Sequence, residues 1–290
     1  MHTYKISLPN IRYGHLMPPE DSMDVQGNIF AVGDGITRDP LVPDGVLPAS
    51  TEEALAYYPN PSGARFASDT FTREFISFMS KREPNQSSVY AAFIDANRKI
   101  RELNQEHNPV VDYLVNDYWA CVGVGAVLDP ANKLHWGLVC DCGLIIYDKD
   151  GTVRFQTPNL MKPFEDAVAS KMVKFEWRTP EGRKIVRSNY RNRLEMKVDD
   201  ECVSYGAMTG EEALADFIRC GSVQLEVGDL AILYTDGCEH VVTHPDFFKT
   251  VYSVQDGVFE QEFVPFAQSL AIEDYEKYGK EKTLVAFVLL

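Results

Sequence analysis

The sequence predicts an α+β layered fold with mainly antiparallel sheets, and three observations support that class. Strand signals follow one another through short connections with turn chemistry, "DPANK" at 129–133 and "DKDG" at 148–151. Helical signals are gathered in pairs, so they do not alternate with strands as the units of a parallel sheet would. A length of 290 residues, 45% of them hydrophobic, allows a sizeable core in one large domain or two small ones.

The first half of the chain begins with a strand signal at 27–34 ("GNIFAVGD") and continues with two helices. One helix is expected over 70–79, with Asp69 as its N-cap. The other is expected over 87–106, because its apolar residues recur at helical spacing on one face. Those residues are Val89, Ala92, Phe93, Ala96, Ile100 and Leu103.

The second half is expected to form closely spaced strands followed by two more helices. The strands fall within 118–129, 133–151 and 152–156. Thr209 and Glu212 have the spacing of a capping box before a helix that runs to about Arg219. The remaining elements are a strand ending in Asp-Gly, a helix entered near Pro265 and a buried closing strand, at 225–237, 262–278 and 283–290.

The composition excludes several classes of function. A formal net charge of −15, from 28 basic and 43 acidic residues, excludes a general nucleic-acid binder, which needs a basic face. No apolar run approaches the roughly 20 residues of a membrane span, and the first residues lack the apolar centre of a signal peptide. Six cysteines in such a chain are expected to be reduced thiols, so we expect a cytoplasmic protein with no membrane partner.

Carboxylates stand at the ends of two apolar strands. Asp34-Gly35 follows "FAVG" and Asp236-Gly237 follows "AILYT", while Glu20-Asp21 lies in a loop before the first strand. Glycine allows a sharp turn and a close approach of its carbonyl to a ligand. Carboxylates brought together repel one another unless cations neutralise them, and hard oxygen ligands suit Mg²⁺ or Mn²⁺. For either Asp-Gly pair alone, a simple turn stays open as the interpretation.

Four stretches of the sequence, at 20–36, 133–151, 204–237 and 281–290, contain motifs that occur in a fixed order along the chain. They are "EDSMDVQGNIFAVGDGI", "KLHWGLVCDCGLIIYDKDG", "SYGAMTGEEALADFIRCGSVQLEVGDLAILYTDG" and "EKTLVAFVLL". Together they resemble the motifs of the type 2C metal-dependent protein phosphatases (PPM family) over nearly the whole chain. The shared features are an acidic pair before a strand ending in Asp-Gly, a central hairpin, a second strand ending in Asp-Gly and a closing strand.

The resemblance implies one type 2C phosphatase-like domain over 1–290, with a loop or lid at 40–68 and a flap-like segment at 157–200. It implies a four-layer α-β-β-α sandwich of two mainly antiparallel sheets flanked by helices. The implied activity is that of a serine/threonine protein phosphatase, which hydrolyses phosphomonoesters with a hydroxide that bridges two Mn²⁺ or Mg²⁺ ions. A phosphorylated protein would then be the substrate, and small phosphate esters are the alternative substrate class.

Carried over position by position, the resemblance implies roles for six residues. Asp34 would be catalytic and bridge the two ions, the Gly35 carbonyl would bind one of them, and Asp236 would ligate the second. The other carboxylates of the set, which would hold metals directly, through water or at a third and looser position, are Glu20, Asp21 and Asp141.

The sequence departs from the family pattern at two places. Lys280 stands where the family has a metal-binding aspartate, three residues before Thr283, and two cations would repel its ammonium group. Glu281 is expected to substitute through a small backbone shift. Otherwise the chain is a non-catalytic pseudophosphatase that binds a phosphoprotein or a regulatory partner. The phosphate-contacting arginine of the family is also displaced, and Arg12 is the candidate for this catalytic contact.

A basic island interrupts this acidic protein. From Lys162 to Lys197 there are ten lysines and arginines against five acids. In the family this region commonly carries a flap beside the active site, so Arg187 and Arg191 are expected to bind an anionic phosphosubstrate. A solvated face is the alternative that stays open. The oligomeric state and the identity of the substrate are also left open by the sequence.

Overall fold

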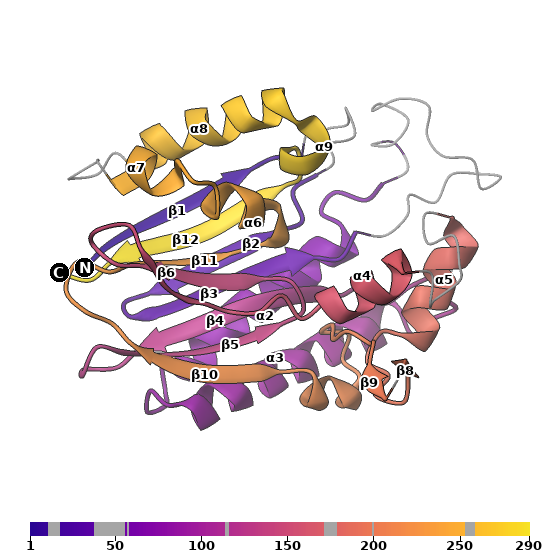
Figure 1. Ribbon diagram of the computed structural model, residues 1–290. Coiled ribbons are helices and arrows are strands. Elements are labelled where there is room, and N and C mark those ends of the chain that lie inside the picture. Colours follow the sequence, from indigo (N-terminus) through magenta and orange to yellow (C-terminus); the bar gives the residue numbers. More distant parts are fainter. Residues whose placement is uncertain are drawn as a thin grey trace.

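Two five-stranded sheets form the centre of the computed structural model, which describes residues 1–10, 18–37, 56, 58–113, 116–170, 179–198, 200–252 and 259–290 (Figure 1). Every neighbouring pair of strands within them is antiparallel. One sheet has the order β1 (His2–Leu8), β12 (Lys282–Val288), β11 (Leu230–Tyr234), β6 (Gly143–Tyr147), β7 (Val153–Gln156). The other has the order β10 (Arg219–Gln224), β5 (Lys133–Val139), β4 (Cys121–Leu128), β3 (Ile29–Gly35), β2 (Ser22–Gln26).

Helices cover the outer face of each sheet (Figure 1). The sheet that contains β3 is covered by α2 (Gly63–Met79) and α3 (Gln86–His107). The sheet that contains β12 is covered by α6 (Asp236–Val242), α7 (Phe247–Tyr252), α8 (Phe259–Glu273) and α9 (Tyr275–Tyr278). The layers therefore run α-β-β-α, and the expected fold class is confirmed. Within the described ranges, none of the helices has both the length and the apolar character that crossing a bilayer requires.

Another group of elements lies at one end of the sandwich, away from the two chain termini (Figure 1). It consists of α4 (Lys162–Ala169), α5 (Pro180–Asn189), β8 (Lys197–Val198) and β9 (Glu201–Cys202). Of these elements, α4, α5 and β8 lie within the segment expected to form a flap, and β9 directly follows it. Of the expected lid at 40–68, residues 40–55 and 57 lie outside the described part of the chain, while 63–68 belong to α2. The expectation of a loop at 63–68 was therefore wrong.

The start of α2 shows why. Ser62 is the N-cap, and its Oγ accepts the N–H of Arg65 at 3.1 Å. Asp69, the expected cap, lies inside the helix, where its carboxylate accepts the Arg65 Nε–H at 2.9 Å. α3 begins as the sequence predicts, because the Asn85 side chain accepts the N–H of Ser88 at 2.8 Å.

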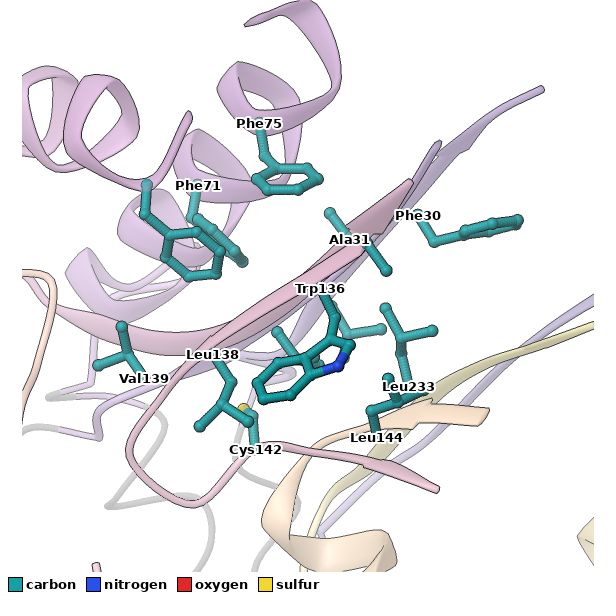
Figure 2. Packing of buried hydrophobic residues seen from close by; sticks show 14 of the residues in the cluster. Phe30, Ala31, Phe71, Phe75, Trp136, Leu138, Val139, Cys142, Leu144 and Leu233 are labelled. Atoms are coloured by element: carbon teal, nitrogen blue, oxygen red, sulfur yellow. The ribbon is translucent and has the colours of Figure 1, made fainter. Parts of the chain in front are cut away.

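The main hydrophobic core fills the space on both faces of the β4–β5 pair. Figure 2 shows Phe71 and Phe75 of α2 on one face, and Trp136, Leu144 and Leu233 on the other, between the two sheets. Burying one such side chain contributes about 1.5–3 kcal/mol. The buried side chains between the layers thus stabilise the sandwich, and polar groups can be placed at its ends.

Three strands of the two five-stranded sheets were not expected from the sequence, and all of them lie at sheet edges. They are β1, β2 and β10. Edge strands expose one side to solvent, so their polar residues hide the strand signal. The helix expected up to Arg219 is only a short 3₁₀ helix, η2 (Glu212–Asp216), because Thr209 Oγ1 accepts the N–H of Glu211 at 3.2 Å and no capping box forms. Pro265 lies within α8 and not at its entrance.

Candidate functional site

Strand register brings the predicted carboxylates to one end of the sandwich. β3 ends at Gly35, which pairs with Cys121 at the start of β4. β11 ends at Tyr234, which pairs with Gly143 at the start of β6 and with Leu284 near the start of β12. Asp34-Gly35 at the end of β3 and Asp236-Gly237 at the start of α6, just after β11, therefore lie at the same edge as the β5–β6 turn and the α9–β12 connection. An antiparallel sandwich collects side chains from separate parts of the sequence in this way.

A pocket of about 320 Å³ opens at this end. Five carboxylates and one lysine ammonium line it, together with Asn10, Gly35 and several uncharged side chains. The carboxylates are Asp21, Asp34, Asp141, Asp236 and Glu281, and the lysine is Lys280. Because negative charge is in excess, the pocket is suited to cations.

The two residues of the acidic pair before β2, Glu20 and Asp21, have different surroundings. Glu20 is 3% exposed, and its carboxylate accepts hydroxyl hydrogen bonds from Thr37, Tyr58 and Ser62. Burial raises the pKa of Glu20, and these hydroxyl groups oppose the rise. Asp21 lines the pocket, and its Oδ2 accepts the Thr235 Oγ1–H at 2.9 Å. Asp21 is therefore available to a ligand in the pocket, whereas the Glu20 carboxylate is occupied by its hydroxyl donors.

Both glycines of the Asp-Gly pairs lie against a neighbouring backbone. A Cβ atom at Gly35 would come within 2.6 Å of the Glu20 carbonyl oxygen, and one at Gly237 within 1.8 Å of the Glu281 carbonyl oxygen. Only a residue without a side chain allows these approaches. The loop that carries Asp21 and the loop that carries Lys280 can therefore lie directly beside the aspartates at the two strand ends.

Glu281 bridges the two ends of the chain. Its carboxylate accepts the backbone N–H groups of Glu20 and Asp21 at 3.0–3.2 Å. Burial raises the pKa of Glu281, and those N–H groups oppose the rise. The Glu281 oxygens thus hold the loop that carries Glu20 and Asp21. A role of Glu281 as the substitute metal ligand stays a prediction.

Asp236 is neutralised by a neighbouring lysine. Lys280 Nζ lies 2.5 Å from Asp236 Oδ2. The nearby Asp236 carboxylate raises the pKa of the Lys280 ammonium, with further contributions from Asp141 and Asp34. Lys280 is therefore protonated at neutral pH and supplies one positive charge to the acidic pocket.

The remaining pocket carboxylates are held in unfavourable surroundings. Burial and the charges of the four other pocket carboxylates raise the pKa of Asp34 well above its ordinary range. Burial, followed by Glu281, does the same to the pKa of Asp21. Burial and Asp236 raise the pKa of Asp141 from 3.8 to about 7, although Lys280 opposes the rise. Such crowding of like charges costs stability unless protons or cations relieve it.

We expect the stability of the metal-free protein to fall as pH rises through the range set by Asp141. Between its unfolded pKa of 3.8 and its folded pKa of about 7, the folded protein binds more protons than the unfolded chain. Excess protons on the folded side mean that stability decreases with rising pH. Thermal unfolding from about pH 5 to about pH 8 should therefore show a steeper fall in Tm for the wild type than for Asp141→Asn. Parallel curves for the two proteins would contradict this assignment.

The donor set of the pocket consists mainly of hard carboxylate oxygens. Its carboxylate chemistry suits one hard divalent ion near Asp34, whose side chain has no hydrogen-bond or ion-pair partner among the residues that the structure describes. In those same residues, no group of three acidic, histidine or cysteine side chains is gathered closely enough to hold an ion. An ion near Asp34 would therefore complete its coordination with the Gly35 carbonyl and water molecules. The Lys280–Asp236 ion pair leaves Asp236 unsuited to a second ion.

Arg187 and Arg191, the predicted substrate-binding residues, form ion pairs inside the protein. Arg187 Nε lies 3.0 Å from Asp117 Oδ2, and Arg191 Nη2 lies 2.6 Å from Asp117 Oδ1. Arg191 is 1% exposed, and Tyr113 and Tyr118 face its guanidinium group at 5.8 Å. This placement argues against the expected substrate-binding role, because both arginines face inward from the flap. Arg12, the expected phosphate contact, lies outside the described residues.

The sequence analysis missed the hydroxyl groups that orient the acidic residues. Thr235 directly precedes Asp236, so its position beside a pocket carboxylate could have been noticed. Tyr58 and Ser62 come from the segment before α2, and no spacing rule links them to Glu20. Tyr205, on the connection that follows the flap, lines the pocket and was missed for the same reason.

Comparison with solved structures places this architecture among known proteins. The catalytic domain of the serine/threonine protein phosphatase PstP, in complex with two manganese ions, matches over 100% of this chain and 98% of its own, with a TM-score of 0.60 and 16% identity. Phosphatase Stp1 of Staphylococcus aureus matches over 100% and 95%, with a TM-score of 0.61 and 13% identity. The chain has the type 2C phosphatase fold.

Phosphatase MsPP of Mycobacterium smegmatis, in complex with cacodylate, shares the type 2C fold over 100% of this chain and 99% of its own, with a TM-score of 0.57 and 12% identity. At such identities the likeness concerns the fold alone. No family model matches the sequence, and no curated protein matches it. The activity of this type 2C fold must therefore be argued from its own pocket.

Proposed function

We propose that this protein is a divalent-cation-dependent phosphatase of phosphoserine and phosphothreonine in proteins. The observation that carries the proposal is the Asp34 carboxylate, which shares its pocket with four other carboxylates and a single ammonium group. The fold supports the same function, since PstP, which has this fold, is a serine/threonine phosphatase that holds two manganese ions. The six cysteines are free thiols, which supports a reducing, cytoplasmic location.

Each pocket residue has a defined task in this proposal. Asp34 would hold a Mn²⁺ or Mg²⁺ ion, the Gly35 carbonyl would be a further oxygen ligand, and Asp21 and Asp141 would act through metal-bound water. An ion bound there would lower the pKa of a coordinated water and neutralise charge on the phosphoryl oxygens. Thr235 orients Asp21 through its hydroxyl group, and Glu281 fixes the loop that carries Asp21. The Lys280 ammonium is the one cationic side chain of the pocket among the described residues, and it can contact an anionic phosphate.

A second candidate function rests on the ion pair between Lys280 and Asp236. With Asp236 neutralised, the chain could act as a non-catalytic module that binds a phosphoprotein or a regulatory partner. The two candidates differ in turnover. Hydrolysis that depends on a divalent ion belongs to the enzyme, whereas binding of phosphopeptides without hydrolysis belongs to the module.

Hydrolysis of p-nitrophenyl phosphate separates these functions. We expect turnover with Mn²⁺, loss of turnover with a chelator, and loss in both Asp34→Asn and Asp236→Asn. A phosphopeptide panel should then show faster hydrolysis of phosphoserine and phosphothreonine peptides than of the small ester. No turnover with any divalent ion, in a protein that is folded by circular dichroism, would replace the enzyme with the binding module.

A further inference from the structure

The ammonium group of Lys280 occupies space that a metal ligated by Asp236 would need. Its Nζ atom is 2.5 Å from Asp236 Oδ2. A Mg²⁺ ion binds a carboxylate oxygen at about 2.1 Å. An ion on that oxygen would therefore lie close to the ammonium group, and two cations at such separation repel strongly when solvent is partly excluded. Lys280 and a metal at Asp236 exclude one another.

The connection that carries Lys280 is held firmly in place. Lys282 is 3% exposed, and its Nζ donates to the carbonyl oxygens of Tyr278 and Lys280, the latter at 2.8 Å. On the other side, Gly237 lies against the Glu281 carbonyl. Backbone contacts thus fix the chain before and after Lys280. The side chain of Lys280 itself is 40% exposed, so the ammonium reaches Asp236 from a supported backbone at the pocket rim.

The surrounding charges favour a cation at this position. Asp141 and Asp34 line the same pocket as Asp236. A single ammonium balances part of this negative charge, as a bound ion would. It differs from a metal in chemistry, because it carries one charge and three N–H donors and has no coordination positions with which to activate a water molecule.

We infer that the Lys280 ammonium is a built-in cation that takes the place of one divalent ion at Asp236. The inference deepens the proposed function, on which it rests for the claim that the pocket holds an ion near Asp34. The wild-type pocket then binds one divalent ion. A carboxylate at position 280 in place of lysine would release Asp236 and complete a second ion site.

Metal stoichiometry tests this directly. Native mass spectrometry and calorimetric titration with Mn²⁺ would compare the wild type with Lys280→Asp. We expect the variant to bind one more Mn²⁺ ion than the wild type. Lys280→Ala removes the ammonium without adding a ligand, and it should also bind Mn²⁺ more tightly than the wild type. Lys249→Asp makes the same change of charge at an exposed residue of α7, outside the pocket lining, and should leave the number of ions unchanged.

The outcomes separate this inference from the proposed function. One ion in the wild type and two in Lys280→Asp supports both. No ion in the wild type and one in Lys280→Asp supports the built-in cation and overturns the metal-dependent phosphatase. Equal numbers in both proteins, or two ions in the wild type, overturn the inference. If Lys280→Asp does not fold, an unchanged Mn²⁺ affinity in Lys280→Ala also overturns it.

Discussion

Asp34→Asn should lower Mn²⁺-dependent phosphatase turnover by about 1000-fold while making the metal-free protein more stable. The loss follows because charge stabilisation by a bound metal is worth several kcal/mol, and about 1.4 kcal/mol corresponds to a tenfold change in rate. The gain follows because Asp34 is buried among four other carboxylates that raise its pKa. Asparagine removes one of these mutually repelling charges at neutral pH, so unfolding should require a higher temperature.

Differential scanning calorimetry with and without Mn²⁺ measures both halves of this expectation. Each kcal/mol of relieved repulsion should raise Tm by roughly 2–4 °C in a protein of this size. Addition of Mn²⁺ should raise the Tm of the wild type and leave that of Asp34→Asn nearly unchanged. Asp150→Asn, at an exposed turn outside the pocket lining, is the matched control and should behave like the wild type. A variant that is less stable than the wild type without metal would contradict the repulsion argument.

Asp117→Asn should have the largest effect on stability. The substitution keeps the shape of the side chain but removes the charge that Arg187 and Arg191 share. Removing one partner of a buried ion pair costs about 3–5 kcal/mol, because the remaining charge is left uncompensated. Arg191 has almost no access to water and cannot recover the loss by hydration. Urea denaturation should show this decrease in the free energy of unfolding.

Glu102→Gln is a matched control for that experiment. Glu102 pairs with Arg98 and Lys99 on the exposed surface of α3. Exposed pairs contribute about 0–1 kcal/mol, so this substitution should change stability little. A similar small loss in Asp117→Asn would mean that the flap is not anchored to the body of the protein by this ion pair.

The sequence predicted the central strands and the carboxylate cluster well, for a physical reason. β3, β11 and β12 are apolar because they are buried, so their patterns are strong, and polar residues mark the ends of β3 and β11. Antiparallel pairing then places the end of β11 beside the start of β12, and the end of β3 beside the start of β4 in the other sheet. The positions of Asp34 and Asp236 follow from these two facts.

What the sequence could not give depends on contacts between distant residues. The inward orientation of Arg187 and Arg191 depends on Asp117, 70 residues or more away, and a count of basic residues does not reveal it. The pairing of Lys280 with Asp236 also joins distant segments. Spacing rules describe local structure, so they cannot tell which charge a side chain will meet across the fold.

The arrangement of the pocket also bears on how such proteins change over time. The charged groups of the pocket come from several strand ends and connections, and the phenylalanines and leucines of the core do not line the pocket. A single substitution at one connection can therefore alter the ion requirement while the body of the protein stays intact. At position 280, a lysine encoded by the gene supplies a positive charge that would otherwise come from an ion taken up from solution.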